Sequence, residues 1–436
     1  MSAAPVLLEI TRLAKLGEGV ALDGGRAVFV PGALPGEQVR AEVSEQDGVL
    51  RARVLERLRD APERRPAPCP VADRCGGCDW QHLAGPAQLR ARVEIVQSTL
   101  QHLGRIAPAS YTLHAPVPAP APLAYRRRAV FHFFKEAGRF QLGLFERGSH
   151  RGVALAACPA LVPALERWLP EVAEQLAPVA ADISAVHLLA EGEARALALE
   201  LKGPVKPRLR EQAERLLRAT GASGAVLLPA SGQPAVLGKP ILQGAAPLRP
   251  GVPLFHRPDG FAQANAGANE ALVRAAVEAL VGTGGGAGQA LELYSGNGNF
   301  SFALAARVHA LTAVETSPVG VELAQRAAHV GGLDNVRFVQ GDALKVARGL
   351  AGEGRRFPLL LVDPPRTGAP GLAAVADALE VERLVYVACD PAALARDAAD
   401  LVKAGFAPQA LQVVDMFPQT HHAEAVMSFA RAGAGG

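Results

Sequence analysis

Glu292-Leu293-Tyr294-Ser295-Gly296-Asn297-Gly298-Asn299-Phe300 ends an apolar run with a turn that contains two glycines. Gly296 and Gly298 let the backbone approach a ligand closely, because neither residue carries a Cβ. The next apolar run ends at Glu315, about 20 residues further on, where a carboxylate can accept hydrogen bonds from both ribose hydroxyls of an adenosine. This segment predicts a strand, a ligand-binding turn and a nucleoside-type cofactor.

Apolar runs alternate with helical patterns from residue 251 to the end, which is typical of a parallel sheet with helices on both faces. The predicted strands cover residues 290–294, 311–315, 336–339, 359–363 and 384–388. We therefore predict an α/β fold with a C-terminal doubly wound, Rossmann-like domain. Ligands of such sheets bind beyond the carboxyl ends of the strands, so the residues there are candidates for the site.

The glycine turn is not the Gly-x-Gly-x-x-Gly of dinucleotide enzymes, because Ser301 stands at the third position. A pyrophosphate needs more backbone donors than this turn offers, whereas S-adenosylmethionine carries no phosphate. The pattern therefore favours S-adenosylmethionine over a nicotinamide cofactor. Asp342, after the third strand, is placed to reach the adenine amino group. The glycines alone also permit a tight turn without any ligand.

Two further strand ends carry reactive groups. Asp363 is followed by two prolines, which fix the backbone so that its carboxylate points into the crevice. Cys389 stands just before a predicted helix at residues 392–403, whose N-terminal amides favour a thiolate. A small buried residue is the alternative for this cysteine, since free cysteines are among the most buried residue types.

The other four cysteines lie earlier in the chain. Cys69, Cys75 and Cys78 form Cys-x5-Cys-x2-Cys, and Cys158 follows about 80 residues later. Four thiolates can hold either a structural zinc ion or an iron–sulfur cluster, so their spacing leaves both open. Cys389 is then left free for catalysis.

The N-terminal and middle regions have different patterns. Short alternating runs over residues 1–58 predict a small β-barrel, and a Pro- and Arg-rich linker at 62–70 leads into a middle region from about 71 to 250. Arginines crowd residues 51–65 and 126–128, where phosphate contacts and a solvated surface are both possible. A dense polar stretch at 415–424 predicts a structured hairpin loop.

The chain has 436 residues, of which 49% are hydrophobic and 20% charged, with a net charge of +3. It is long enough for two or three domains, and its charge is too mild to identify an anionic partner. No apolar run approaches the roughly 20 residues that span a bilayer, and the N-terminus lacks the pattern of a signal peptide. We expect a cytoplasmic protein that makes no membrane contact and needs no obligate protein partner.

Several segments, read in chain order, resemble the RNA uracil-5-methyltransferases. They are residues 13–43, which are similar to a TRAM domain, the four cysteines, Phe261-Ala262-Gln263-Ala264-Asn265, Asp363-Pro364-Pro365-Arg366, Cys389-Asp390-Pro391 and Phe417-Pro418-Gln419-Thr420-His421-His422-Ala423-Glu424. The resemblance covers nearly the whole chain. It differs at Ala388, where the family usually has serine, which puts local hydrogen bonding in doubt but not the nucleophile.

The resemblance implies a role for each candidate residue. It implies a TRAM, OB-like barrel at 1–58, a central iron–sulfur and RNA-binding domain at 59–250, and a methyltransferase domain at 251–436. It assigns a [4Fe-4S] cluster to Cys69, Cys75, Cys78 and Cys158. S-adenosylmethionine binding falls to Gln263, Tyr294, Gly296, Asn299, Glu315, Asp342 and Asp363. Cys389 is the implied nucleophile and Glu424 the proton acceptor.

The implied reaction is the methylation of carbon 5 of a uridine, through a covalent bond between Cys389 and carbon 6. A barrel together with a cluster is more typical of the 23S ribosomal RNA enzymes of the family, so we expect ribosomal RNA, with a tRNA uridine as the alternative. An RNA-binding protein with a vestigial catalytic domain is a second alternative, against which the intact Cys389 and Glu424 argue. A radical S-adenosylmethionine enzyme is disfavoured, because its Cys-x3-Cys-x2-Cys spacing is absent.

Overall fold

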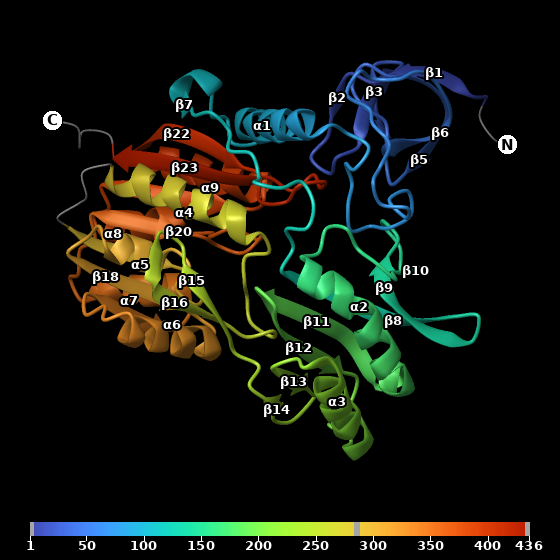
Figure 1. Ribbon diagram of the computed structural model, residues 1–436. Coiled ribbons are helices and arrows are strands. Elements are labelled where there is room, and N and C mark those ends of the chain that lie inside the picture. Colours follow the sequence, from blue (N-terminus) through green and yellow to red (C-terminus); the bar gives the residue numbers. More distant parts are fainter. Residues whose placement is uncertain (1–3, 283–287, 432–436) are drawn as a thin grey trace.

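A computed structural model describes residues 4–282 and 288–431 of the chain (Figure 1). Six N-terminal strands form one sheet in the order β1-β5-β6-β4-β3-β2. They are β1 (Val6–Glu9), β2 (Arg12–Leu13), β3 (Gly19–Asp23), β4 (Arg26–Val30), β5 (Gln38–Gln46) and β6 (Val49–Arg59). Strand β1 also lies against β3, so the sheet curls round on itself. The predicted small β unit is confirmed; β3 was not predicted, because Gly19 reads as a turn residue.

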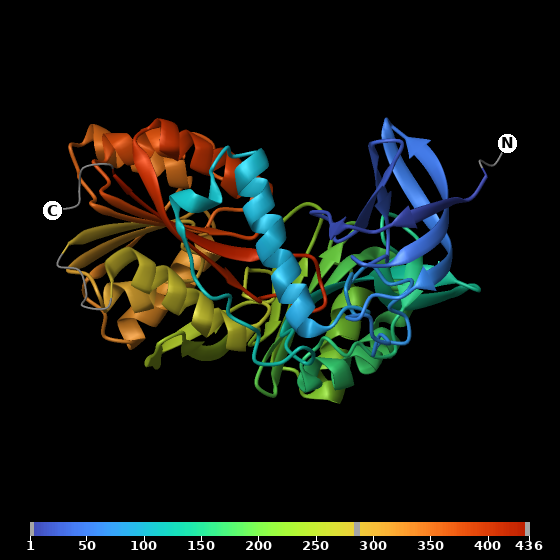
Figure 2. The same ribbon diagram turned by 90° about the horizontal axis from the view of Figure 1, so that it is seen from above.

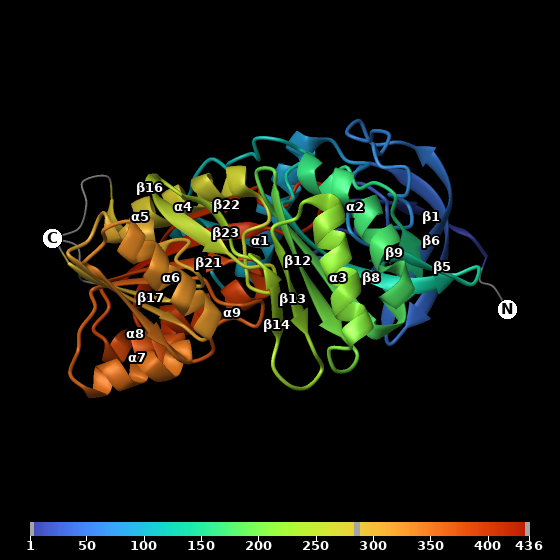
Figure 3. The same ribbon diagram turned by 60° about the horizontal axis from the view of Figure 1, so that its bottom comes forward.

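The central region is built on a seven-stranded sheet, in the order β10-β9-β8-β11-β12-β13-β14. Its strands are β8 (Arg128–Glu136), β9 (Arg139–Phe145), β10 (Gly152–Ala154), β11 (Ile183–Glu191), β12 (Ala194–Leu201), β13 (Gly224–Leu228) and β14 (Ala235–Gly238). Helices α2 (Pro163–Leu176) and α3 (Pro207–Thr220) lie side by side on one face (Figure 3). The buried Trp168 packs between this face and the helices. The 3-10 helix η2 (Ala177–Asp182) completes the region. A second 3-10 helix, η1 (Pro108–Ser110), contacts β7 (Thr112–Leu113) and β22 (Phe406–Val414) of the C-terminal region, and a hairpin of β15 (Leu242–Ala246) and β16 (Arg249–His256) packs on C-terminal helices through β16.

The C-terminal region holds an eight-stranded sheet in the order β19-β18-β17-β20-β21-β23-β22-β7. Its strands are β17 (Gln289–Leu293), β18 (Ala310–Glu315), β19 (Val336–Gln340), β20 (Leu359–Val362), β21 (Arg383–Ala388), β22 (Phe406–Val414), β23 (Glu424–Arg431) and the short β7 (Thr112–Leu113). Strands β17 to β21 are parallel, whereas β23 is antiparallel to β21 and β22. The order reverses between β17 and β20, which creates a crevice beyond their carboxyl ends.

Helices cover both faces of this sheet. Helices α4 (Ala266–Val281), α5 (Ser301–Ala305) and α6 (Pro318–Val330) lie on one face, and α7 (Ala343–Gly352), α8 (Leu372–Ala378) and α9 (Pro391–Lys403) lie on the other. The predicted doubly wound α/β fold is therefore confirmed, and the bounds of β17 to β21 lie within one residue of those predicted. Within the described residues, no helix has both the length and the apolar character needed to cross a membrane.

Helix α1 (Gly85–His102) connects the regions. It packs on α9 of the C-terminal region and runs toward the N-terminal barrel (Figure 2). Strand β7, which follows α1, pairs with β22 at the edge of the eight-stranded sheet. Both elements come from the predicted central domain, so the division at residues 58 and 250 stays a prediction.

Candidate active site

The turn after β17 lies at the crevice where the strand order reverses. Its backbone is left-handed at Tyr294 (φ 66°), Gly296 (φ 57°) and Gly298 (φ 96°). A Cβ at Gly298 would lie only 2.5 Å from the ring of Phe302, so a larger residue would clash there. Partial burial raises the pKa of the neighbouring Tyr294 hydroxyl to about 12, which keeps it protonated. Glycine is thus required where the sequence predicted close approach to a ligand.

Glu315 and Asp342 organise the next two strand ends. The Glu315 carboxylate accepts hydrogen bonds from the backbone N–H of Gly296 at 2.9 Å and of Ser317 at 2.7 Å. Each carboxylate oxygen has a second lone pair, so ribose hydroxyls can still be accepted. The exposed Asp342 accepts the N–H of Lys345 at 2.8 Å and caps α7. Their contact with a nucleoside stays a prediction.

Gln263 and Asn299 have different surroundings, although both are buried. The backbone carbonyl of Gln263 accepts a hydrogen bond from Arg127, while its side-chain amide has no partner among the residues that the structure describes. That amide is free to bind a ligand. The Asn299 side chain instead exchanges two hydrogen bonds with Asn269, at 2.7 and 3.0 Å. Asn269 was not predicted, because a single buried asparagine in a helix gives no sequence signal.

Cys389, Glu424 and Asp363 meet at neighbouring strand ends. Cys389 follows β21, Glu424 begins β23, and Asp363 follows β20. Burial and the nearby carboxyl groups of Glu424 and Asp363 raise the pKa of the Cys389 thiol to about 12, against the opposing effect of Arg366. Burial likewise raises the pKa of Asp363 to about 7 and that of Glu424 well above its ordinary value. Asp363 and Glu424 therefore titrate as a coupled pair, and both carboxyl groups disfavour the Cys389 thiolate.

This geometry corrects one expectation. The N-terminal amides of α9 were expected to favour a Cys389 thiolate, but the Asp390 side chain accepts the N–H groups of both Ala392 and Ala393 at 2.9 Å. Asp390 thus takes the donors that the thiolate would have used, and the pKa of Cys389 is raised instead of lowered. The other Asp390 oxygen accepts from Lys15 of the N-terminal barrel at 2.7 Å. Lys15 was not predicted.

The 415–424 loop, which joins β22 to β23, is held by α1. The fully buried Arg92 pairs with Asp415 at 3.1 Å and donates to the carbonyls of Thr420 at 2.7 Å and Phe417 at 3.0 Å. Gln88, one helical turn away, also bonds to Gln419. The predicted structured loop is present, but its partners lie more than 300 residues away in the sequence.

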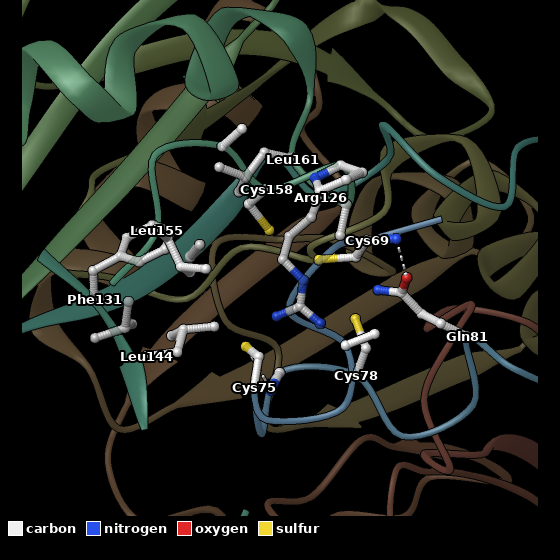
Figure 4. A pocket seen from close by; sticks show the side chains of 17 residues that line it. Cys69, Cys75, Cys78, Gln81, Arg126, Phe131, Leu144, Leu155, Cys158 and Leu161 are labelled. Atoms are coloured by element: carbon white, nitrogen blue, oxygen red, sulfur yellow. Dashed lines mark hydrogen bonds between the residues drawn. The ribbon is translucent and has the colours of Figure 1, made fainter. Parts of the chain in front are cut away.

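The four remaining cysteines line one cavity of about 70 Å³. Their sulfur atoms face a common space into which the guanidinium of Arg126 extends (Figure 4). Burial raises the pKa of Cys75, Cys78 and Cys158, and the other cysteines add to the effect. Within residues 4–282 and 288–431, no three potential ligands are placed to hold a single metal ion. The structure thus brings the four cysteines together at one cavity, and their role as metal ligands stays a prediction.

The two arginine runs are less available than expected for phosphate contacts. Arg126, Arg127 and Arg128 are largely or partly buried, and Arg127 pairs with Glu191. In the first run, ion pairs join most arginines to carboxylates: Arg51 to Glu18, Arg53 to Glu42, Arg57 to Asp60, Arg59 to Glu9 and Arg64 to Glu37. Apart from Asp60, which is three residues from Arg57, these partners lie more than ten residues away in the sequence, so local patterns cannot reveal the pairing.

Comparison with known proteins places these features in a family. The family described as tRNA (uracil-5-)-methyltransferase matches residues 88–432, and the TRAM domain matches residues 6–55. The chain is 35% identical over 428 residues to the 23S rRNA (uracil(1939)-C(5))-methyltransferase RlmD of Pseudomonas putida, covering 97% of this chain and 93% of that protein. It is 34% identical over 433 residues to the RlmD of Klebsiella pneumoniae, covering 98% and 96%.

A solved structure has the same fold. The crystal structure of the Pyrococcus abyssi tRNA (uracil-54, C5)-methyltransferase, in complex with S-adenosyl-L-homocysteine, matches with a TM-score of 0.72. It covers 99% of this chain and 100% of that one, at 22% sequence identity. The match to the family extends over the sheet, the strand ends and the 415–424 loop, and the relatives are matched nearly end to end. The chain belongs to the RNA uracil-5-methyltransferase family.

Proposed function

We propose that this protein transfers a methyl group from S-adenosylmethionine to carbon 5 of a uridine in 23S ribosomal RNA. The observation that carries the proposal is the meeting of Cys389, Asp363 and Glu424 beside the glycine turn of a doubly wound sheet. Relatives that match nearly the full length of the chain are named as 23S rRNA enzymes, which favours ribosomal RNA over tRNA.

The cofactor would lie across the crevice between β17 and β20. Gln263, Tyr294, Gly296, Asn299, Glu315, Asp342 and Asp363 are the residues proposed to surround it. The free amide of Gln263 and the remaining lone pairs of Glu315 support direct contacts. Asn299 is proposed to act through the backbone that its bonds with Asn269 hold in place. S-adenosylmethionine supplies the methyl group on its sulfonium.

Carbon 5 of uracil is a weak nucleophile, and addition of a thiolate to carbon 6 makes it a strong one. Cys389 supplies that thiolate. The raised pKa of Cys389 means that its proton must leave during the addition, and Asp363 can take it up, which leaves Glu424 available as a base for the later step. Protonation of Asp363 also removes its repulsion of the thiolate. After methyl transfer, Glu424 as a carboxylate removes the carbon 5 proton, and the bond between sulfur and carbon 6 breaks.

We also propose that Cys69, Cys75, Cys78 and Cys158 hold a [4Fe-4S] cluster. In a cluster each cysteine binds its own iron, so the sulfur atoms need not converge on one ion, as a single zinc would require. The buried Arg126 guanidinium can compensate the negative charge of the thiolates, and apolar side chains such as Leu144 and Leu155 exclude water. Anaerobically purified protein should contain about four irons per chain. Stoichiometric zinc without iron would contradict this assignment.

The substrate is tested by methyl transfer in vitro. Purified protein is given tritiated S-adenosylmethionine and either 23S rRNA or bulk tRNA lacking 5-methyluridine, with Cys389→Ala as the control. We expect label in one uridine of 23S rRNA only, without added reductant. Label in tRNA alone would make the protein a tRNA enzyme, and label in neither RNA would favour the RNA-binding alternative. A requirement for a reductant would favour radical chemistry.

A further inference from the structure

The 415–424 loop ends at Glu424, and many of its hydrogen bonds are made with residues 65–81. Residues 69–81, which include Cys69, Cys75 and Cys78, are called the cysteine segment below. The carbonyl of Gln419 accepts hydrogen bonds from the backbone N–H of Asp79 and of Trp80, both at 2.9 Å. Arg65 donates to the Gln419 side chain at 2.9 Å and to the carbonyl of Gln81 at 3.1 Å. The stretch after Cys78 and the 415–424 loop are thus bonded together at several points.

One contact between the two segments joins charged or ionisable side chains. The Asp79 carboxylate lies 2.6 Å from Nδ1 of His421 and accepts the backbone N–H of His421 at 3.3 Å. Its other oxygen pairs with Arg147 at 3.1 Å. Only 10% of the Asp79 side chain and 19% of the His421 side chain are exposed, so water screens this contact weakly. Asp79 directly follows Cys78 in the sequence.

His421, the partner of Asp79, lies close in the sequence and in the structure to the proposed reacting group Glu424. The ring of His421 lies 4.3 Å from the ring of His422, which in turn lies 6.0 Å from Phe417. Burial, His421 and Arg366 lower the pKa of His422 to about 4, so this ring is neutral and packs as an uncharged group. Arg366 also lowers the pKa of Cys389 and that of Glu424, so it lies near all three side chains. Glu424 stands three residues beyond His421, at the start of β23.

We propose that Asp79 and His421 are positioning residues that fix the 415–424 loop so that Glu424 can remove the carbon 5 proton. Neither residue needs to touch the RNA for this role. The inference rests on the proposed function, because it assigns Glu424 to the last step of that reaction. Loss of one buried, charge-assisted contact should slow that step roughly 10- to 100-fold.

The test compares Asp79→Ala, His421→Ala and the double variant with wild type at one fixed pH. Arg74→Ala is the matched control, because Arg74 lies in the same cysteine segment and pairs with Glu146 at 3.4 Å, away from the loop. With excess enzyme and labelled RNA, we expect methyl transfer within about twofold of wild type. In Asp79→Ala and His421→Ala, breakdown of the covalent protein–RNA product should be roughly 10- to 100-fold slower than in wild type. The covalent product should therefore accumulate and be visible as a shifted band on a denaturing gel.

Two kinetic results would overturn the proposal. If the effects of the single variants multiply in the double variant, the residues act independently and not as a pair. Loss of bound metal and slow breakdown in Asp79→Ala alone, with His421→Ala normal, would show that Asp79 acts through the cysteines.

Hydrogen exchange of the loop amides gives a readout that needs no activity. We expect exchange in residues 415–424 to be roughly 10- to 100-fold faster in both single variants and unchanged in Arg74→Ala. Unchanged exchange in the single variants would refute the pair. An inactive wild-type protein in which exchange still responds as expected would refute the proposed function and leave the contact standing.

Discussion

Replacing Glu292 by glutamine should change how the stability of the protein depends on pH. Glu292 lies in the middle of the eight-stranded sheet, is 1% exposed and forms no ion pair among the described residues. Burial raises its pKa from 4.5 to about 8; the nearby Ser301 hydroxyl opposes this shift, and Asp363 and Glu315 add to it. The folded protein therefore keeps this proton at neutral pH, whereas the unfolded chain releases it.

The direction and size of the pH effect on the unfolding free energy follow from the difference in the Glu292 pKa between the folded and unfolded states. Below pH 4.5 both states hold the proton, and between pH 4.5 and about 8 only the unfolded state loses it, so stability falls as pH rises. At roughly 1.4 kcal/mol for each pH step, wild type should lose about 3 kcal/mol of unfolding free energy by pH 7. Glutamine does not titrate, so Glu292→Gln should lack this loss. Any constant cost of the buried amide leaves the slope unaffected.

Urea denaturation of both proteins at several pH values between 5 and 8 measures the difference. The exposed Glu353→Gln provides the control, because it removes a carboxylate from the same domain without touching the core. We expect the stability of Glu292→Gln relative to wild type to increase steadily with pH, and that of the control to stay constant. Parallel pH profiles for wild type and Glu292→Gln would refute the reasoning.

Three further predictions concern the site. Lys15→Ala should leave the unfolding free energy nearly unchanged but lower kcat/KM about two- to fivefold, because a half-exposed ion pair holds Asp390 beside the nucleophile; unchanged kinetics would contradict this role. Iodoacetamide should alkylate Cys389 at pH 7 roughly 1,000-fold more slowly than a free thiol, because the raised pKa leaves little thiolate. The rate, followed by mass spectrometry, should be higher in Asp363→Asn, and a rate equal to that of a free thiol would rule out the raised pKa. Single-turnover methylation should fall as the pH drops below about 7, where Asp363 becomes protonated and can no longer take up the thiol proton. A flat profile from pH 5.5 to 8 would exclude Asp363 as the acceptor of that proton.

The sequence was sufficient for features that depend on neighbouring residues. The runs of apolar residues predicted strands β17 to β21, and the two glycines predicted the turn after β17. Both features depend on neighbouring residues in the chain, because backbone preferences act locally. The residues at strand ends, such as Cys389 and Asp363, could be predicted to converge, because the carboxyl ends of parallel strands share one edge. The four cysteines could be grouped from composition and spacing alone.

Long-range pairing could not be predicted in this way. The contacts Lys15–Asp390, Arg92–Asp415 and Asp79–His421 join residues more than 300 positions apart, and nothing local to either partner indicates the other. The sign of the Cys389 pKa shift was wrong for a related reason. Burial and the carboxyl groups of Glu424 and Asp363, which come from other strands, raise the pKa of Cys389, and Asp390 accepts the helix N–H groups that could have favoured the thiolate.

The central claim is that Cys389 bonds covalently to carbon 6 of the uridine. Two variants test its two steps separately: formation of this bond, and its breakdown after removal of the carbon 5 proton. Purified wild type, Cys389→Ala and Glu424→Gln are each incubated with S-adenosylmethionine and labelled substrate RNA, then run on a denaturing gel. We predict no shifted band for Cys389→Ala, because no thiol can add to carbon 6, and a persistent shifted band for Glu424→Gln, because the carbon 5 proton cannot leave. A shifted band in Cys389→Ala, or full turnover by either variant, would contradict the mechanism.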